Sequence, residues 1–271
     1  RLLGKISHPY KENGCDTVLF GTGDIVIDTI LCEGVKMMRN NQLEQANTLH
    51  ESVLHIRADV VQALYALTVG QITHMKTVGV GVSGASRDYV KGTKKLISDV
   101  IALRPDHPIG YWLQAQVLEL TSNSASSSSS LYGAESRQGS TGNKADVGIL
   151  ASLNTAIANC LLGSNIDFCS DTNIDRTAPT YLHVRIQETV DQYHSVHPNT
   201  LLIIMYNSRS QLYNRNGRLE ESLQDLLSIH QSLVSDCTNG SENCVTEEFY
   251  SKLLDVHSSL GNYDDALLTC T

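Results

Sequence analysis

The chain has 271 residues, of which 41% are hydrophobic, a composition that supports a folded core and excludes a wholly disordered chain. Its 20 basic and 29 acidic residues give a formal net charge of −9, so direct binding of nucleic acid or anionic lipid is disfavoured as its main activity. The sequence contains no uninterrupted run of about 18 apolar residues, and we therefore expect no membrane insertion.

The seven cysteines are irregularly spaced, and no two are separated by two residues, as zinc ribbons and thioredoxin-like sites require. This odd number favours reduced core thiols, so we predict a cytoplasmic protein. An alternative comes from Cys237 and Cys244, which bracket the glycosylation sequon Asn239-Gly240-Ser241. In a secreted protein this segment would be a disulfide-closed, glycosylated loop.

Apolar residues recur at intervals of three and four along most of the chain, and strand-like alternation is rare, so we predict an all-α protein. The helices are expected over residues 30–38, 43–56, 60–75, 86–103, 109–120, 145–162, 180–196, 201–215, 219–235 and 246–260. The first two are separated by Arg39-Asn40-Asn41, which favours a turn.

Composition changes at residue 121. Residues 121–143 include the run Ser-Ala-Ser-Ser-Ser-Ser-Ser at 124–130, which cannot bury enough apolar surface to offset ordering, and we predict a disordered surface loop there. Pairing the helix at 109–120 with the one at 180–196 leaves no helix unpaired. We therefore predict three parts: helical repeats over 1–120, an insertion over 121–178 that contains the helix at 145–162, and helical repeats over 179–271.

Two tandem copies of one pattern stand near the C-terminal end. The first reads Tyr206-x2-Arg209-Ser210-x2-Tyr213, then Gly217-Arg218-Leu219-Glu220-Glu221-Ser222; the second reads Tyr250-x2-Leu253-Leu254-x2-His257, then Gly261-Asn262-Tyr263-Asp264-Asp265-Ala266. Both resemble the tetratricopeptide repeat (TPR), in which a bulky and a small residue on one helix precede a glycine turn and a second helix with a small residue. The resemblance implies a TPR-like α-solenoid of antiparallel helix pairs.

Earlier parts of the chain match this pattern more weakly. Gly34-x2-Met37 is followed by Ala46, and Thr93 precedes Pro105 by the twelve residues usual at the end of a repeat. A non-repetitive helical bundle is the alternative for this half. Because the chain begins at Arg1 and its last predicted helix stops at Thr271 after barely two turns, we expect it to be an excerpt of a longer protein.

In a TPR-like stack the concave inner surface is built mainly from the first helix of each pair. At such positions stand Trp112, Gln116, Asn207, Gln211 and Arg215, which we predict to bind a helix or an extended peptide of a protein partner. The alternative for Trp112 is a place in the core, because this side chain is largely apolar.

Three short segments are similar to the TPR-bearing large subunit of the signal recognition particle. They are Asn41-Gln42-Leu43-Glu44-Gln45, Arg104-Pro105-Asp106-His107 ahead of a helix with Gln114-Ala115, and Asp191-Gln192 followed by His197-Pro198-Asn199. This resemblance implies a scaffold that holds the particle's other large subunit in the targeting of secretory proteins, with RNA reached only through partners. A TPR scaffold of another assembly is the alternative.

An enzyme is the third hypothesis, because the segment Gly79-Val80-Gly81-Val82-Ser83-Gly84 matches the dinucleotide-binding pattern G-x-G-x-x-G. That site needs a strand before the glycines, whereas the preceding residues favour a helix, although residues 72–80 could form a short strand. We therefore predict no catalytic residues and no cofactor.

Two other groups of residues are candidate sites. His183, His194 and His197 lack the further ligand that would complete a tetrahedral metal site, and we predict no metal. The basic cluster of Arg87 with Lys91, Lys94 and Lys95 is interpreted as a solvated helix face or as a contact for an acidic partner or RNA phosphate.

Overall fold

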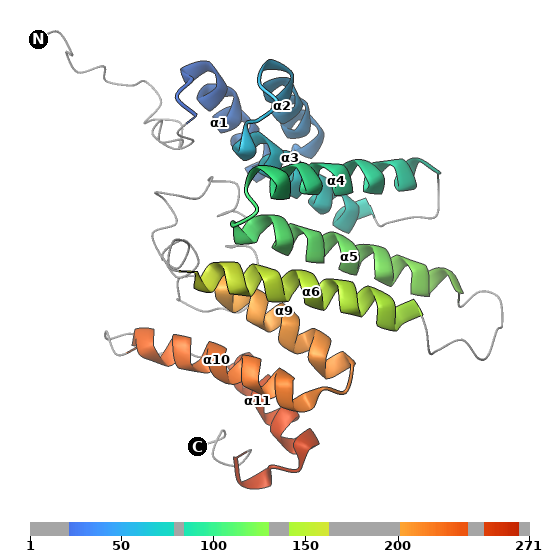
Figure 1. Ribbon diagram of the computed structural model, residues 1–271, viewed down its shortest axis with the longest axis vertical. Coiled ribbons are helices and arrows are strands. Elements are labelled where there is room, and N and C mark those ends of the chain that lie inside the picture. Colours follow the sequence, from blue (N-terminus) through green and yellow to red (C-terminus); the bar gives the residue numbers. More distant parts are fainter. Residues whose placement is uncertain (1–21, 79–83, 130–140, 163–200, 238–246, 266–271) are drawn as a thin grey trace, which may run out of the picture. The chain divides into compact units, whose positions relative to one another are not determined.

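The computed structural model describes residues 22–78, 84–129, 141–162, 201–237 and 247–265, and all regular secondary structure within these ranges is helical (Figure 1). The all-α prediction is thus confirmed. The chain divides into two compact units, and in both of them the helices form stacked pairs that resemble TPR repeats. None of the helices in the described ranges is long and apolar enough to cross a membrane.

The first unit contains α1 (Ile25–Arg39), α2 (Leu43–Ile56), α3 (Val61–Val78) and α4 (Gly84–Leu103). Helix α2 packs against α1 and α3, α3 packs against α4, and α1 also contacts α3, so that successive pairs lie in series. Their facing sides are buried and mainly apolar, with Leu31, Val35, Val53, Ala63 and Val100 among the core residues. This order of contacts is that of a repeat stack.

Helix α1 begins five residues before its predicted start at Ile30. The reason is an N-terminal cap, since the Asp24 carboxylate accepts hydrogen bonds from the amides of Val26 at 2.9 Å and Ile27 at 3.3 Å. Such a cap satisfies amides that have no partner within the helix and thereby extends it.

The second unit contains α5 (Pro108–Ser129), α6 (Thr141–Leu161), α9 (Leu201–Arg215), α10 (Leu219–Cys237) and α11 (Glu247–Leu260). Each packs against the next in this order. The last three helices enclose a buried cluster of Leu226, Ile229, Phe249, Leu253 and Val256. Helix α9 has the predicted bounds, and α10 and α11 differ from prediction by one or two residues at one end.

Three turns share one geometry. Asn41 after α1, Gly217 after α9 and Gly261 after α11 all have left-handed backbones, with φ of 59°, 69° and 76°. In each, the amide of that residue donates to the carbonyl three residues earlier, and the next amide donates to the carbonyl five residues earlier. This Schellman-type ending closes the first helix of a pair and reverses the chain. The α1–α2 pair is therefore a repeat of the same kind as the two near the C-terminal end.

The helix that contains residues 109–120 packs against α6 in the described residues. Helix α5 packs along α6 in antiparallel orientation, and α6 packs against α9 in turn (Figure 1). Helix α6 is thus the observed neighbour of α5, although we predicted it within an insertion, and the pairing with residues 180–196 stays a prediction. Residues 180–196, the predicted partner, lie outside the described residues.

The serine run also differs from its prediction as a loop. Helix α5 continues to Ser129, and only residues 130–140 of the predicted loop lie outside the described ranges. Serine is only slightly poorer than average as a helix former, so a run of serines can extend a helix that has already formed. At the start of this extension, Thr121 and Ser122 donate hydrogen bonds to carbonyls of the preceding turn.

The cysteines contradict the expectation of reduced thiols. Both Cys32 on α1 and Cys160 on α6 are disulfide-bonded and almost fully buried. Disulfide bonds are typical of secreted proteins and of oxidising compartments. Cys244 and the sequon at Asn239 lie outside the described residues.

Candidate protein-binding surface

The first helices of successive pairs in the second unit come together at α5 and α9. The guanidinium Nη2 of Arg215, in the last turn of α9, lies 3.2 Å from the Oε1 of Glu119 on α5. Both side chains are more than one-third exposed, so this ion pair lies at the surface. It connects α5 and α9, the first helices of two pairs, on the same face of the unit. We call this α5–α9 face the candidate surface.

The predicted residues lie on these two helices. Gln211 is exposed one turn before Arg215, and Gln116 is half-buried one turn before Glu119. Asn207 is half-buried one further turn back along α9. All five predicted positions therefore stand on the two helices that the Arg215–Glu119 pair joins, and four of them are exposed or half-buried.

Trp112 belongs instead to the core, which was the alternative open from the sequence. Its side chain is only 7% exposed, and its indole N–H is buried without a hydrogen-bond partner. A partner could reach this ring only after rearrangement of the surrounding side chains. The large apolar area of the indole explains its burial. Residue spacing within α5 does not show whether this side chain faces solvent or the core.

The orientation of α9 is fixed by a polar network that the sequence analysis missed. The guanidinium of Arg209 donates to both carboxylate oxygens of Asp225 on α10, at 2.8 and 2.7 Å, and to the Oδ1 of Asn154 on α6 at 2.7 Å. Its guanidinium carbon also lies 5.4 Å and 5.7 Å from the ring centroids of Tyr206 and Tyr213. One arginine thus connects three consecutive helices.

Burial and pairing act against each other in this network. Burial raises the pKa of the Asp225 carboxyl, and the Arg209 hydrogen bonds oppose that rise without cancelling it. Burial also acts to lower the pKa of Arg209, but the hydrogen bonds and charge of Asp225, together with Tyr213 and Tyr206, outweigh it and raise that pKa. The desolvation of the two charges therefore offsets much of their attraction, and the pair fixes helix orientation more than it adds stability.

A second contact between α9 and α10 explains the small residues of the repeat pattern. The hydroxyls of Ser210 and Ser222 lie 2.9 Å apart, and each hydroxyl also donates to the other residue's carbonyl. Both residues are buried. Small side chains with internal partners let the two backbones approach closely at this crossing, as the repeat pattern predicted.

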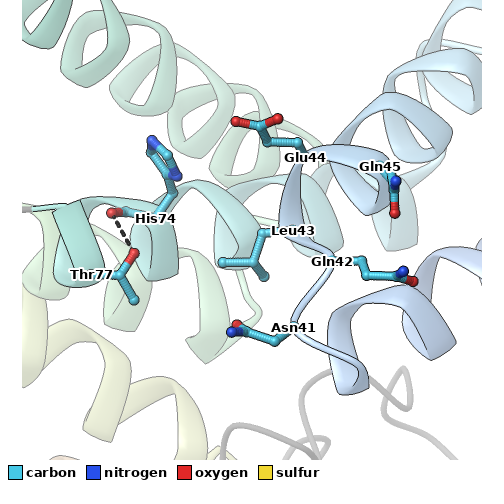
Figure 2. Close-up of a pocket in the computed structure, with 7 residues that line it drawn as sticks. All are labelled: Asn41, Gln42, Leu43, Glu44, Gln45, His74 and Thr77. Carbon is cyan, nitrogen blue, oxygen red and sulfur yellow. Dashed lines mark hydrogen bonds between the residues drawn. The ribbon is translucent and has the colours of Figure 1, made fainter.

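The first unit holds a separate open cavity of about 430 Å³ between the start of α2 and the end of α3. Figure 2 shows its lining, which consists of residues 41–45 together with His74 and Thr77. The Thr77 hydroxyl donates to the His74 carbonyl at 3.0 Å, so this hydroxyl is engaged within its own helix. All but one of the lining residues are polar, the exception being Leu43, so the cavity offers both polar and apolar contacts.

The cofactor and metal hypotheses gain no structural context in the described residues. The glycine-rich segment follows helix α3, which extends to Val78, and not the strand that a dinucleotide site requires. Residues 79–83 themselves, and His183, His194 and His197, lie outside the described residues. Among the residues that are described, no three histidine, cysteine or acidic side chains are grouped as a metal would require.

One signal in the sequence could have identified the first repeat. The segment Asn41-Gln42-Leu43-Glu44-Gln45-Ala46 aligns with the two segments that begin at Gly217 and Gly261, because asparagine replaces glycine at the left-handed position. The Arg209 network and the Arg215–Glu119 pair had no comparable signal, since their members are 16, 55 and 96 residues apart.

No protein-family model matches the chain, and no curated protein matches it either. Among solved structures, the chain is similar to TPR-like repeats of a kinesin light chain from Podosopora anserina, with 12% identity, a TM-score of 0.46, and 90% of this chain and 91% of that one covered. It is also similar to a thermophilic TPR protein of Thermus thermophilus, with 16% identity, a TM-score of 0.37, and 89% and 99% of the two chains covered.

Proposed function

We propose that the protein is a non-enzymatic scaffold that binds a protein partner at the candidate surface of α5 and α9. The observation that carries this proposal is the Arg215–Glu119 pair, which brings exposed polar side chains of two first helices onto one face. Gln211 is exposed beside this pair, and Gln116 and Asn207 border it. Amide side chains of this kind both donate and accept, so they suit the backbone of an extended peptide or the polar side of a helix.

Site-specific photo-crosslinking tests this proposal. A photoreactive amino acid at Gln211 is expected to capture a partner from cells, and Arg215→Ala is expected to reduce the capture. The control position is Gln224, which is also exposed but lies on the second helix, α10. Equal capture from Gln211 and Gln224 would contradict a specific surface on α5 and α9.

We further propose, from the three short sequence matches alone, that the assembly is the signal recognition particle and that the partner is its other large subunit. The protein would then reside in the cytoplasm and associate with RNA through partners. Affinity purification of the full-length protein is expected to recover that subunit and the particle RNA. Recovery of other partners without the subunit would contradict this assignment and leave the scaffold proposal intact.

The disulfide bonds favour a different location. Buried disulfide-bonded Cys32 and Cys160 are typical of an oxidising compartment, whereas the particle assignment requires the reducing cytoplasm. Imaging and fractionation of the tagged full-length protein distinguish these locations. A lumenal or secreted pool would exclude the particle and favour a scaffold of another assembly.

The enzyme hypothesis has its own test. A protein that binds a nucleotide cofactor tightly at residues 79–84 must unfold at a higher temperature when the cofactor is added, because binding stabilises the folded state. We expect NAD to cause no thermal shift. A clear shift that is lost in Gly81→Val would contradict the non-enzymatic proposal.

A further inference from the structure

A basic stripe runs along one side of α4 in the first unit. At 3.6 residues per turn, Arg87, Lys91, Lys94 and Lys95 fall within an arc of about 100° on this helix. All four side chains are exposed. The opposite side of α4 is buried, with Thr93, Ile97 and Val100 almost inaccessible to solvent, so packing fixes which side faces outward.

The four cations of the stripe form no ion pair with the two acidic residues at its edge. Within the part of the chain that the structure describes, none of its four side chains forms an ion pair or hydrogen bond. Like charges spaced four residues apart, as in Arg87, Lys91 and Lys95, destabilise an isolated helix. Asp88 and Asp99 lie at one edge of the arc and leave the centre of the stripe positive. Such a concentration of charge contrasts with the net charge of −9 for the whole chain.

Next to the stripe, the surface of α4 carries no side chain at Gly92. Gly92 is exposed, and a Cβ atom at this position would meet no other atom within 4 Å. A glycine inside a helix is less stable than alanine, and no packing requires it here. At 3.6 residues per turn, Gly92 lies about 60° around the helix from Lys95 and about 100° from Lys91, so it leaves open only the Lys95 edge of the stripe.

From this charge complementarity we propose that the stripe of Arg87, Lys91, Lys94 and Lys95 binds an acidic segment of a partner protein. The stripe extends over about 12 Å, the length of roughly four residues in an extended chain, and so fits a short run of glutamates or aspartates. RNA fits less well. Its affinity grows with the number of phosphates neutralised, and four cations on a strongly acidic protein supply few such contacts.

Fluorescence anisotropy with a labelled peptide of about eight glutamates tests this inference on the full chain. The peptide is expected to bind, a peptide of glutamines to show no binding, and affinity to fall when salt rises from about 0.05 M to about 0.3 M. The triple variant K91E/K94E/K95E is expected to weaken binding about tenfold or more, since several favourable pairs become repulsive.

Matched variants separate charge from folding. K94E is expected to weaken binding measurably, whereas K144E, an equal change at an exposed lysine of α6, is expected to leave it unchanged. K91R/K94R/K95R keeps the charge and is expected to retain binding, and circular dichroism checks that every variant keeps its helix content. The proposal is overturned if the glutamate peptide fails to bind, if K94E and K144E behave alike, or if single-stranded RNA of equal charge binds this stripe more tightly than the peptide.

Discussion

The imidazole of His50 on α2 occupies the space that a side chain at Gly34 on α1 would need. A Cβ atom at Gly34 would collide with the Nε2 of His50, and both residues are buried. Gly34 stands twelve residues before Ala46, as Ser210 stands twelve before Ser222, so this contact marks the close crossing of the first helix pair. The histidine fits there only because its neighbour has no side chain.

Gly34→Ala is therefore expected to lower the free energy of unfolding by about 1–3 kcal/mol, because a buried ring has little room to move. The control is Gly92→Ala on α4, where the space is open and the better helix former should add about 0.5–1 kcal/mol. Denaturant unfolding measures both. If the two alanine variants changed stability by the same amount, the collision with His50 would play no part.

His50 should make folding sensitive to acid. Its two ring nitrogens are buried without hydrogen-bond partners, and burial lowers the pKa of the imidazole from 6.5 to about 4. Above pH 6.5 the ring is neutral in both states and no stability is lost. As the pH falls from there toward 4 the unfolded chain binds the proton first, so stability decreases, by on the order of 3 kcal/mol in total.

Comparison of variants isolates this contribution. His50→Leu is expected to flatten the decrease in stability between pH 6.5 and pH 4, whereas replacement of the exposed His55 on the same helix leaves the decrease unchanged. Chemical denaturation at a series of pH values supplies the measurement. A wild-type slope that persists in His50→Leu would assign the acid sensitivity to other groups.

The shared turn geometry gives a pair of opposite expectations. Gly217→Ala should destabilise the α9–α10 pair by about 1 kcal/mol, because a left-handed backbone is unfavourable for residues with a Cβ. Asn41→Gly should stabilise the α1–α2 pair slightly for the same reason. Thermal unfolding detects both, and a destabilising Asn41→Gly would indicate that the asparagine side chain is needed at that turn.

Periodicity and turn residues together predicted α2 and α9 at their observed bounds, because both helices carry an apolar face and end at a clear turn. Pairing was harder to predict. We predicted α6 within an insertion because pairing residues 109–120 with 180–196 leaves no helix unpaired, yet α5 extends to Ser129 and packs against α6. Local sequence decides where a helix forms, whereas its partner depends on contacts between distant residues.

The candidate surface likewise depends on contacts between residues that are distant in sequence. Repeat spacing placed Gln211 and Arg215 on an accessible side of α9, but it could not decide whether Trp112 faces solvent or core. The environment of Trp112 depends on which helices pack against α5. Residue spacing within α5 gives no information about those helices. The ion pair between Arg215 and Glu119, on which the proposed function rests, likewise joins helices that are far apart in sequence.

The disulfide bonds can be counted chemically. Unfolded, unreduced protein is expected to show fewer than seven reactive thiols, because Cys32 and Cys160 are both disulfide-bonded. Reduction should lower the free energy of unfolding, by about 2–4 kcal/mol for a typical disulfide. Titration with a thiol reagent before and after reduction provides the count, and seven reactive thiols without reduction would restore the expectation of a reduced protein.

The Arg209–Asp225 pair gives the sharpest contrast between single and double replacement. Asp225 is 4% exposed and Arg209 17% exposed, so replacement of either partner leaves the other charge poorly solvated. Arg209→Met or Asp225→Leu alone should each reduce stability by about 3 kcal/mol, whereas the double variant should lie close to wild type, since desolvation already offsets much of the attraction. Arg209→Met also removes the bond to Asn154 on α6, so Asn154→Ala measures that smaller contribution separately.

A double-mutant cycle by urea unfolding gives the coupling energy. If the two single losses simply added in the double variant, the pair would be no more than two independent surface contacts, and α9 would have to be held in place by its apolar packing alone.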